Sequence, residues 1–140
     1  MSALMICKTE IKNKKALLEA LSLMGVPKEC VQVSKGSDWL TLKSYGTQKD
    51  RPAEILITKD NYGGYGDCGF FKEEENYDIL IDDLDDRGAL ARKWSEGKSF
   101  SNSIKQWYAA AVAKKTLKQQ GFSTTITQDG NRLRVLAQVA

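Results

Sequence analysis

Three pairs of strand-like segments in this chain are each joined by a short, turn-rich connection, a pattern that favours antiparallel pairing. Parallel strands would need a crossover of a dozen or more residues between them. The pairs are 30–34 with 39–44 across Lys35–Asp38, 67–72 with 77–82 across Glu73–Asn76, and 122–127 with 132–139 across Asp129-Gly130. Within the first two turns, Gly36 and Asn76 are the residues that we expect to adopt a positive φ.

Two more strands are predicted at 5–11 and 54–58, on either side of a well-marked helix. Asn13 is the residue that we expect to cap this helix, because its side chain can accept a hydrogen bond from the first turn. The helix ends where Gly25 can adopt a left-handed conformation. One face of the helix carries the apolar residues Ala16, Leu17, Ala20, Leu21 and Met24.

A second long helix is predicted over residues 102–120, and a short extra helix is predicted to run through Trp94. Asp85 or Asp86 is the expected cap of the short helix. Together these elements predict an α+β protein, with a largely antiparallel sheet and two main helices packed on one face. Because the chain has no low-complexity linker, we expect one α+β domain over residues 1–140.

The composition excludes several classes of enzyme. There is no histidine among the 140 residues, which rules out histidine-dependent triads and metal sites within the chain. The three cysteines form no Cys-x-x-Cys pair, so we expect reduced, packed thiols and a cytoplasmic protein. No segment approaches the ~20 apolar residues that span a bilayer, and no membrane partner is expected.

Charge is strongly segregated along the sequence. Residues 73–86 carry eight acidic and no basic side chains, whereas residues 87–140 carry ten basic and two acidic ones. Such blocks suggest self-complementary packing or oppositely charged partners, but plain solvated surface is the favoured interpretation. The pI of about 8.7 falls short of the value above 9 that is typical of nucleic-acid-binding domains, so nucleic acid is not an expected partner.

Several short motifs together give the chain a family resemblance. The chain resembles the hypothetical chloroplast reading frame thirty-five family, a domain of unknown function in cyanobacteria, plastids, other bacteria and bacteriophages. The resemblance implies a compact α+β domain, and it implies no catalytic residue. The motifs are Met1-Ser2, Lys8-Thr9-Glu10-Ile11, Asp67-x-Gly69-Phe70, Tyr77-Asp78, Gln106-x-Tyr108-Ala109, Gln120-Gly121-Phe122 and Asp129-Gly130.

The chain also departs from the family pattern at polar positions. Relatives often carry His where this chain has Ala3, Tyr-His where it has Ala110-Ala111, and Arg where it has Trp107. If those polar residues form a site in relatives, the corresponding surface is apolar here. The resemblance therefore favours a binding role over an inherited enzymatic one.

A tyrosine-glycine segment is the first candidate for a ligand site. Tyr62, Gly63, Gly64 and Tyr65 combine residues that permit close backbone approach to a phosphate with rings that can stack on a base. Arg132 and Arg134 share one face of a predicted strand and could bind the phosphates of a small ligand. A structural turn is nevertheless the favoured interpretation of this segment, since it matches no established phosphate-binding motif.

The acidic block offers a candidate cation site. Asp82, Asp83, Asp85 and Asp86 could supply carboxylate oxygens to Mg²⁺ or Ca²⁺, which would permit a carboxylate-metal hydrolase. Alternation along a strand, however, directs Asp82 and Asp83 to opposite faces. A strand end followed by a helix cap is therefore the favoured interpretation, and we expect no resident metal or cofactor.

Two exposed features are candidate interface residues. Glu73, Glu74 and Glu75 lie at a predicted hairpin tip, from which they could contact Arg132, Arg134 or Lys118 of another copy. Trp94, on the short extra helix, is the tryptophan that we expect to face a partner.

The residues thus predict a non-enzymatic binding module that acts through protein contact or self-association. The alternatives are a small-ligand or nucleotide-binding protein, including a phage protein that captures a phosphorylated signal, and a carboxylate-metal hydrolase. The partner expected for the binding module is another protein or a second copy of the chain in a homo-oligomer. The partner expected for the first alternative is a small phosphorylated ligand.

Overall fold

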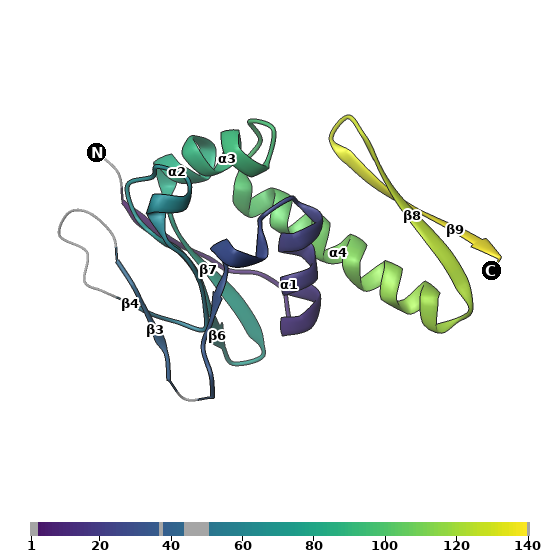
Figure 1. Ribbon diagram of the computed structural model, residues 1–140, viewed down its shortest axis with the longest axis horizontal. Helices are drawn as coiled ribbons and strands as arrows, with labels where there is room; N and C mark the ends of the chain where they lie inside the picture. The colour runs from purple at the N-terminus through teal and green to yellow at the C-terminus, as the bar shows by residue number, and fades with distance from the viewer. Residues whose placement is uncertain (1–2, 37, 44–50, 140) are drawn as a thin grey trace.

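The computed structural model describes residues 3–36, 38–43 and 51–139 of the 140-residue chain. At its centre is a five-stranded sheet in the order β1-β7-β6-β5-β2, in which every neighbouring pair is antiparallel (Figure 1). Its strands are β1 (Leu4–Cys7), β2 (Gln32–Val33), β5 (Ile55–Ile57), β6 (Cys68–Glu73) and β7 (Asn76–Asp82). The antiparallel sheet predicted from the turn spacing is thus confirmed.

The β6–β7 pair forms the predicted hairpin with a tighter turn than expected. Glu73 lies opposite Asn76 in the strand register, which leaves only two residues in the loop. The positive φ therefore falls on Glu74, at 58°, rather than on Asn76. In the preceding turn Gly36 has the positive φ that the sequence predicts, at 63°.

Helix α1 (Lys14–Leu23) is positioned as its sequence predicts. The side chain of Asn13 accepts a hydrogen bond of 3.0 Å from the backbone N–H of Ala16 and so caps the helix. Gly25 follows with a φ of 96°. The predicted apolar face is buried at Ala16, Leu17, Ala20 and Leu21.

The helices cover one face of the sheet and enclose the main core with it (Figure 1). This arrangement follows from the apolar face of α1 and from the alternation of the strands, which directs every second side chain to the helical side. The largest fully buried side chains of this cluster include Leu17, Leu21, Phe70, Ile79, Phe100 and Ile104.

A two-stranded ribbon covers part of the opposite face. It consists of β3 (Leu40–Leu42) and β4 (Arg51–Ala53), and it buries Leu42 and Ala53 against Leu56 and Leu80 of the sheet. Gly69 permits this approach, since a Cβ there would lie 2.8 Å from Cδ1 of Leu42.

The hairpin predicted between segments 30–34 and 39–44 is wrong. Strand β2 pairs with β5 at the edge of the main sheet, whereas β3 pairs with β4. Among the described residues, only Lys35 and Asp38 bridge across the predicted turn. The two segments diverge because Cys30 and Val31 pack against the main core, whereas Leu40 and Leu42 pack into the cluster on the opposite face of the sheet. The turn signal does not reveal this. Within these segments, Ser37 and Ser44 lie outside the described residues.

The short extra helix is divided in two. The segment forms α2 (Asp83–Arg87) and α3 (Ala89–Trp94), separated by Gly88. The predicted cap is wrong, because Asp82 rather than Asp85 or Asp86 accepts hydrogen bonds from the first turn of α2. The carboxylates of Asp85 and Asp86 are instead directed to other segments. Two 3-10 turns complete the helical elements, η1 (Lys28–Cys30) and η2 (Lys59–Asn61).

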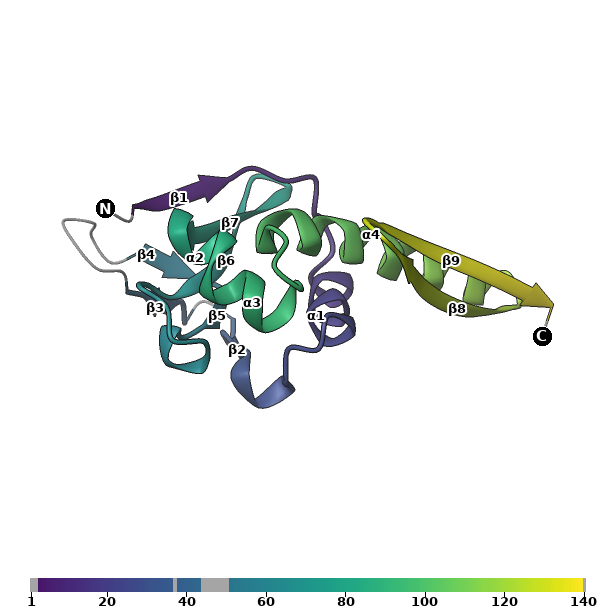
Figure 2. The same cartoon turned by 90° about the horizontal axis from the view of Figure 1, so that it is seen from above.

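The C-terminal part of the chain extends away from the sheet (Figure 2). Helix α4 (Phe100–Gln119) begins at Ser99, and the hairpin of β8 (Phe122–Asp129) and β9 (Arg132–Val139) folds back along it as a separate two-stranded sheet. Both elements confirm the predicted ones to within about two residues. At the tip of the hairpin, Lys98 donates a hydrogen bond of 2.8 Å to the carbonyl of Gly130. We call residues 105–139 the C-terminal arm.

Candidate functional site

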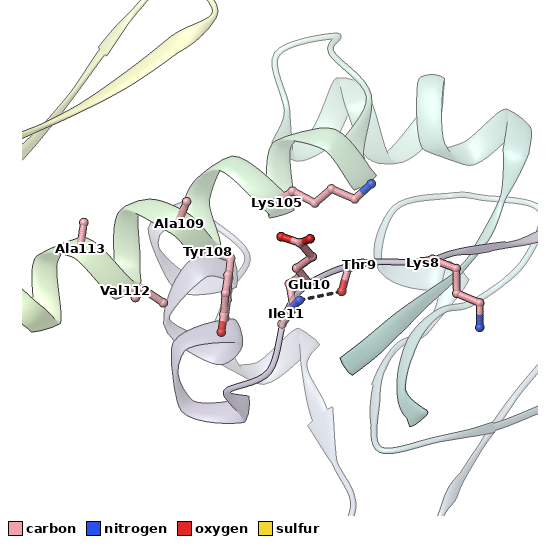
Figure 3. A pocket seen from close by; sticks show the side chains of 9 residues that line it. All are labelled: Lys8, Thr9, Glu10, Ile11, Lys105, Tyr108, Ala109, Val112 and Ala113. Atoms are coloured by element: carbon pink, nitrogen blue, oxygen red, sulfur yellow. Dashed lines mark hydrogen bonds between the residues drawn. The ribbon is translucent and has the colours of Figure 1, made fainter. Parts of the chain in front are cut away.

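A groove of about 760 Å³ lies between α4 and the segment that joins β1 to α1 (Figure 3). Lys105, Ala109 and Val112 share one face of α4 because they recur at intervals of three or four residues. Residues 8–11 form the opposite wall. The groove is open rather than enclosed, so its contents would remain partly in contact with solvent.

Hydrogen bonds to β7 fix the wall formed by residues 8–11. The hydroxyl of Thr9 donates to the carbonyl of Tyr77 and accepts a hydrogen bond of 2.9 Å from the N–H of Ile11. The N–H of Tyr77 in turn donates to the carbonyl of Ile11 at 2.8 Å. This wall is therefore an extension of the sheet and is held in place before any ligand binds.

Tyr108 connects the floor of the groove to α1. Its hydroxyl accepts hydrogen bonds of 3.1 Å from the backbone N–H groups of both Lys12 and Asn13. Those groups precede the first turn of α1, so α4 and α1 are joined at the end of the groove. The ring of Tyr108 then presents its carbon atoms to the groove (Figure 3).

The floor of the groove is apolar. Val112 is 38% exposed. It lies at the margin of the buried face of α4, which turns toward Ile104 and Ala111. Inside the groove, the hydroxyls of Thr9 and Tyr108 are already engaged within the chain. An occupant would therefore meet carbon atoms more often than free hydrogen-bonding groups.

Charged side chains stand at the rim. Lys8 donates a hydrogen bond of 2.7 Å to the carboxylate of Asp78, and this contact raises the pKa of the Lys8 ammonium. Glu10 and Lys105 lie at the same end of the groove (Figure 3), and neither forms a salt bridge with a described residue. The rim of the groove thus carries side chains of both charge signs.

The tyrosine-glycine segment is a closely packed turn in this structure. Tyr62 is buried, and its hydroxyl donates to the carbonyl of Gly66. Burial raises the pKa of Tyr62. A Cβ at Gly64 would overlap the ring of Tyr62 and lie 2.7 Å from Oδ2 of Asp85. Gly63 has a φ of 70°, and Tyr65 is exposed.

The backbone donors of this turn are occupied by a carboxylate of the chain itself. Asp85 accepts hydrogen bonds from the N–H groups of Tyr65, at 3.0 Å, and Gly66, at 3.1 Å. A phosphate at this position would have to displace Asp85. The pKa of Asp85 is raised by its burial, against the opposing effect of these two hydrogen bonds.

The structure does not bring Arg132 and Arg134 to the tyrosine-glycine turn. Both lie on β9, which runs beside α4 in the C-terminal arm, whereas the tyrosine-glycine turn follows η2 on the side of the main sheet (Figure 2). Arg134 forms an exposed salt bridge of 3.3 Å with Asp129. The six residues predicted to share a ligand site therefore belong to two separate surfaces.

The four candidate metal-ligating aspartates point in different directions. Asp82 caps α2, Asp83 accepts a hydrogen bond of 2.9 Å from the N–H of Ala3, and Asp85 holds the tyrosine-glycine turn. Asp86 accepts from Ser99 and from both the N–H and hydroxyl of Ser101. Across the described part of the chain, no group of three His, Cys, Asp or Glu side chains is placed to hold a metal ion.

The predicted interface residues differ in their surroundings. Glu75 lies in the β6–β7 turn and is 3.9 Å from Lys12 of the same chain, an exposed pair. Glu73 and Glu74 are also exposed. Trp94 is half-buried instead, with its ring centroid 6.0 Å from that of Tyr62 and 6.2 Å from that of Phe100. Most of its packing is therefore internal.

Sequence reasoning missed the groove, although it had singled out both of its walls. The motifs Lys8-Thr9-Glu10-Ile11 and Gln106-x-Tyr108-Ala109 were noted separately, and the structure places them face to face. No local pattern could show this, because nearly 100 residues separate them. The one usable signal is Val112, an apolar residue at the margin of the apolar face.

The fold is that of an α+β protein with an open groove between a long helix and an extension of the sheet. A family model described as a protein of unknown function (DUF1257) matches residues 28–133, and the chain belongs to that family. No curated protein and no solved structure matches the chain. The matched region includes the α4 side of the groove but not residues 8–11. Among the described residues, no helix has the length and apolarity needed to cross a membrane.

Proposed function

We propose that this protein is a non-enzymatic binding module and that the groove along α4 is where it contacts another polypeptide. The observation that carries this proposal is the chemistry of the groove. Its floor is formed by carbon atoms of Ala109, Val112 and Tyr108, and the hydroxyls that reach it are already hydrogen-bonded. Apolar side chains of a partner suit such a surface, because they need no hydrogen-bonding partner.

The nucleotide-binding alternative receives less support from the same geometry. A phosphate site needs free backbone donors or converging cations, and the donors at Tyr65 and Gly66 are used by Asp85. The hydrolase alternative needs carboxylates that converge on a cation. Asp82, Asp83, Asp85 and Asp86 are each engaged with a different segment instead. Neither alternative has a specific observation in its favour.

The proposal also includes the finer family relationship and the location of the protein. We place the chain with the hypothetical chloroplast reading frame thirty-five proteins, because the motifs at 8–11 and 106–109 that carry this resemblance form the two walls of one groove. A cytoplasmic location is consistent with three free cysteines, of which Cys68 is buried.

Site-specific photo-cross-linking in the host cells tests the proposed function. A photo-reactive residue replaces Glu10, which is exposed at the rim of the groove, and in a matched variant it replaces Glu29, which is exposed on η1. We expect a discrete adduct only from position 10. An adduct of twice the 15.6 kDa chain mass would identify the partner as a second copy of the chain. An adduct of any other mass would identify the partner as a different protein. The absence of an adduct, or identical adducts from both positions, would overturn the proposal.

A further inference from the structure

The C-terminal arm, whose helix forms one side of the groove, carries an excess of positive charge. Residues 105–139 contain six basic side chains and one acidic one, a net charge of +5. Two of the six are paired, Lys114 with Glu19 and Arg134 with Asp129. The remaining four form no salt bridge with a described residue, and they are Lys105, Lys115, Lys118 and Arg132.

The groove continues across α4 toward the hairpin. Ala109 and Ala113 line it, and they also line a second, smaller depression on the hairpin side that includes Arg132 and Leu133. One apolar surface thus crosses the helix, with Lys105 on one side and Arg132 on the other. The small side chains at Ala109 and Ala113 allow another helix to approach closely.

The open face of α4 also limits the size of an occupant. From Lys105 to Thr116 the helix rises by about 16 Å, which corresponds to about three turns of a partner helix. A helix of that length with apolar residues on one side would cover Ala109, Val112 and Ala113. Acidic residues on its flanks would then lie near Lys105 and Arg132. Glu10 would repel an acidic residue of the partner helix only where that helix lies against the wall formed by residues 8–11.

From these observations, and resting on the proposed function, we propose that the groove binds a short acidic amphipathic helix of a partner protein. Positive charge on the arm attracts the segment and sets its orientation, and the apolar floor supplies contact area. The phosphates of a nucleic acid strand would pair with the basic side chains of the arm. They would not bind the apolar floor, because phosphates and sugars form no favourable contact with the methyl groups of Val112 and Ala113.

Synthetic peptides test this inference without knowledge of the natural partner. The probes are fluorescent helical peptides of about three turns, one with leucines on one face and glutamates elsewhere, one with lysines in place of the glutamates, and one with serines in place of the leucines. A single-stranded DNA oligonucleotide is the fourth probe. We expect saturable binding of the acidic leucine peptide alone, with shifts in the amide NMR signals of Ala109, Val112 and Ala113.

Variants then locate the binding. Lys105→Glu should weaken the acidic leucine peptide by about two- to fivefold, the range given by one exposed ion pair, whereas Lys93→Glu on α3 should not. Val112→Asp should weaken it by about tenfold or more, because it places a charge against apolar side chains. Val33→Asp, at a similarly exposed valine on β2, should leave the affinity unchanged.

Several outcomes would overturn the inference. Equal affinities of the acidic and basic peptides would show that charge does not select the partner. Equal affinities of the serine peptide and the acidic leucine peptide would show that the apolar floor does not contribute to binding. Tighter binding of the DNA at the same amides would mean that the arm is a nucleic-acid surface. If no peptide binds while position 10 still gives a specific adduct, the partner has another chemistry and only the proposed function stands.

Discussion

The backbone N–H of Asn13 donates a hydrogen bond of 3.1 Å to the hydroxyl of Tyr108, 95 residues further along the chain. Asn13 is also the residue whose side chain caps α1. The capping residue is thus held within its own helix through its side chain and on α4 through its backbone N–H. This relationship fixes the end of the groove at the junction of the two helices.

Loss of the Tyr108 hydroxyl should therefore lower stability measurably. In Tyr108→Phe, two backbone N–H groups lose their acceptor, and we expect a decrease of about 0.5–1.5 kcal/mol in the free energy of unfolding in urea. Tyr65→Phe is the matched control, since the exposed hydroxyl of Tyr65 has no hydrogen bond to a described residue. Equal stabilities of the two variants would contradict the assigned role.

The buried face of α1 gives a packing prediction. Leu21 is 1% exposed, so Leu21→Ala should lower the free energy of unfolding by about 2–5 kcal/mol through lost burial and a residual cavity. Leu84→Ala, at a leucine that is 46% exposed, should change it by about 0.5 kcal/mol or less. Chemical denaturation of both variants checks the difference, and a similar cost at the two positions would show that α1 does not bury this face.

Asp85 should make stability depend on pH in a direction opposite to that of most carboxylates. Burial raises its pKa above the ordinary value of 3.8, so folding favours the protonated form. The resulting stability is present below pH 3.8 and is lost as the pH rises through the higher pKa of the folded state. Asp85→Asn does not titrate, and other carboxylates cancel in the comparison.

The free energy of unfolding of wild type minus that of Asp85→Asn should accordingly fall as the pH increases from acid toward neutral. Urea titrations across that interval measure the difference directly. If the difference grows with pH, the hydrogen bonds from Tyr65 and Gly66 outweigh burial, and the pKa of Asp85 is lowered rather than raised.

The thiol of Cys68 should be the slowest of the three to react. It is fully buried, and its burial raises the pKa well above the ordinary value, whereas Cys7 and Cys30 are half-buried. In a titration of the native protein with an aromatic disulfide, the slow phase should disappear in Cys68→Ala and the faster phases should remain. Immediate reaction of all three thiols would contradict this packing.

Elements defined by local signals were predicted well from the sequence. The Asn13 cap, the buried face of α1 and the β8–β9 hairpin each depend on residues only a few positions apart. The hairpin predicted from 30–34 failed because strand partners are chosen by the surface that each strand buries. Likewise Asp85 was expected to cap a helix, and its actual role depends on the turn at Tyr65, 20 residues away.

The candidate site could not be predicted from the sequence, since its two walls come from segments that are far apart in the chain. The family resemblance singled out Lys8–Ile11 and Gln106–Ala109, but nothing in either segment indicates that they face each other. The predicted combination of Tyr62 with Arg132 shows the converse problem. Residue types suited to one ligand were grouped by chemistry, and the topology separates them (Figure 2).

The central claim is that the apolar floor of the groove is a contact surface for another polypeptide. It is tested most directly by repeating the photo-cross-linking from position 10 in a Val112→Asp background, with Val33→Asp as the matched control. We expect the adduct to be lost with Val112→Asp and kept with Val33→Asp, provided that both variants retain the circular dichroism spectrum of the wild type. An adduct of undiminished yield in Val112→Asp would contradict the claim.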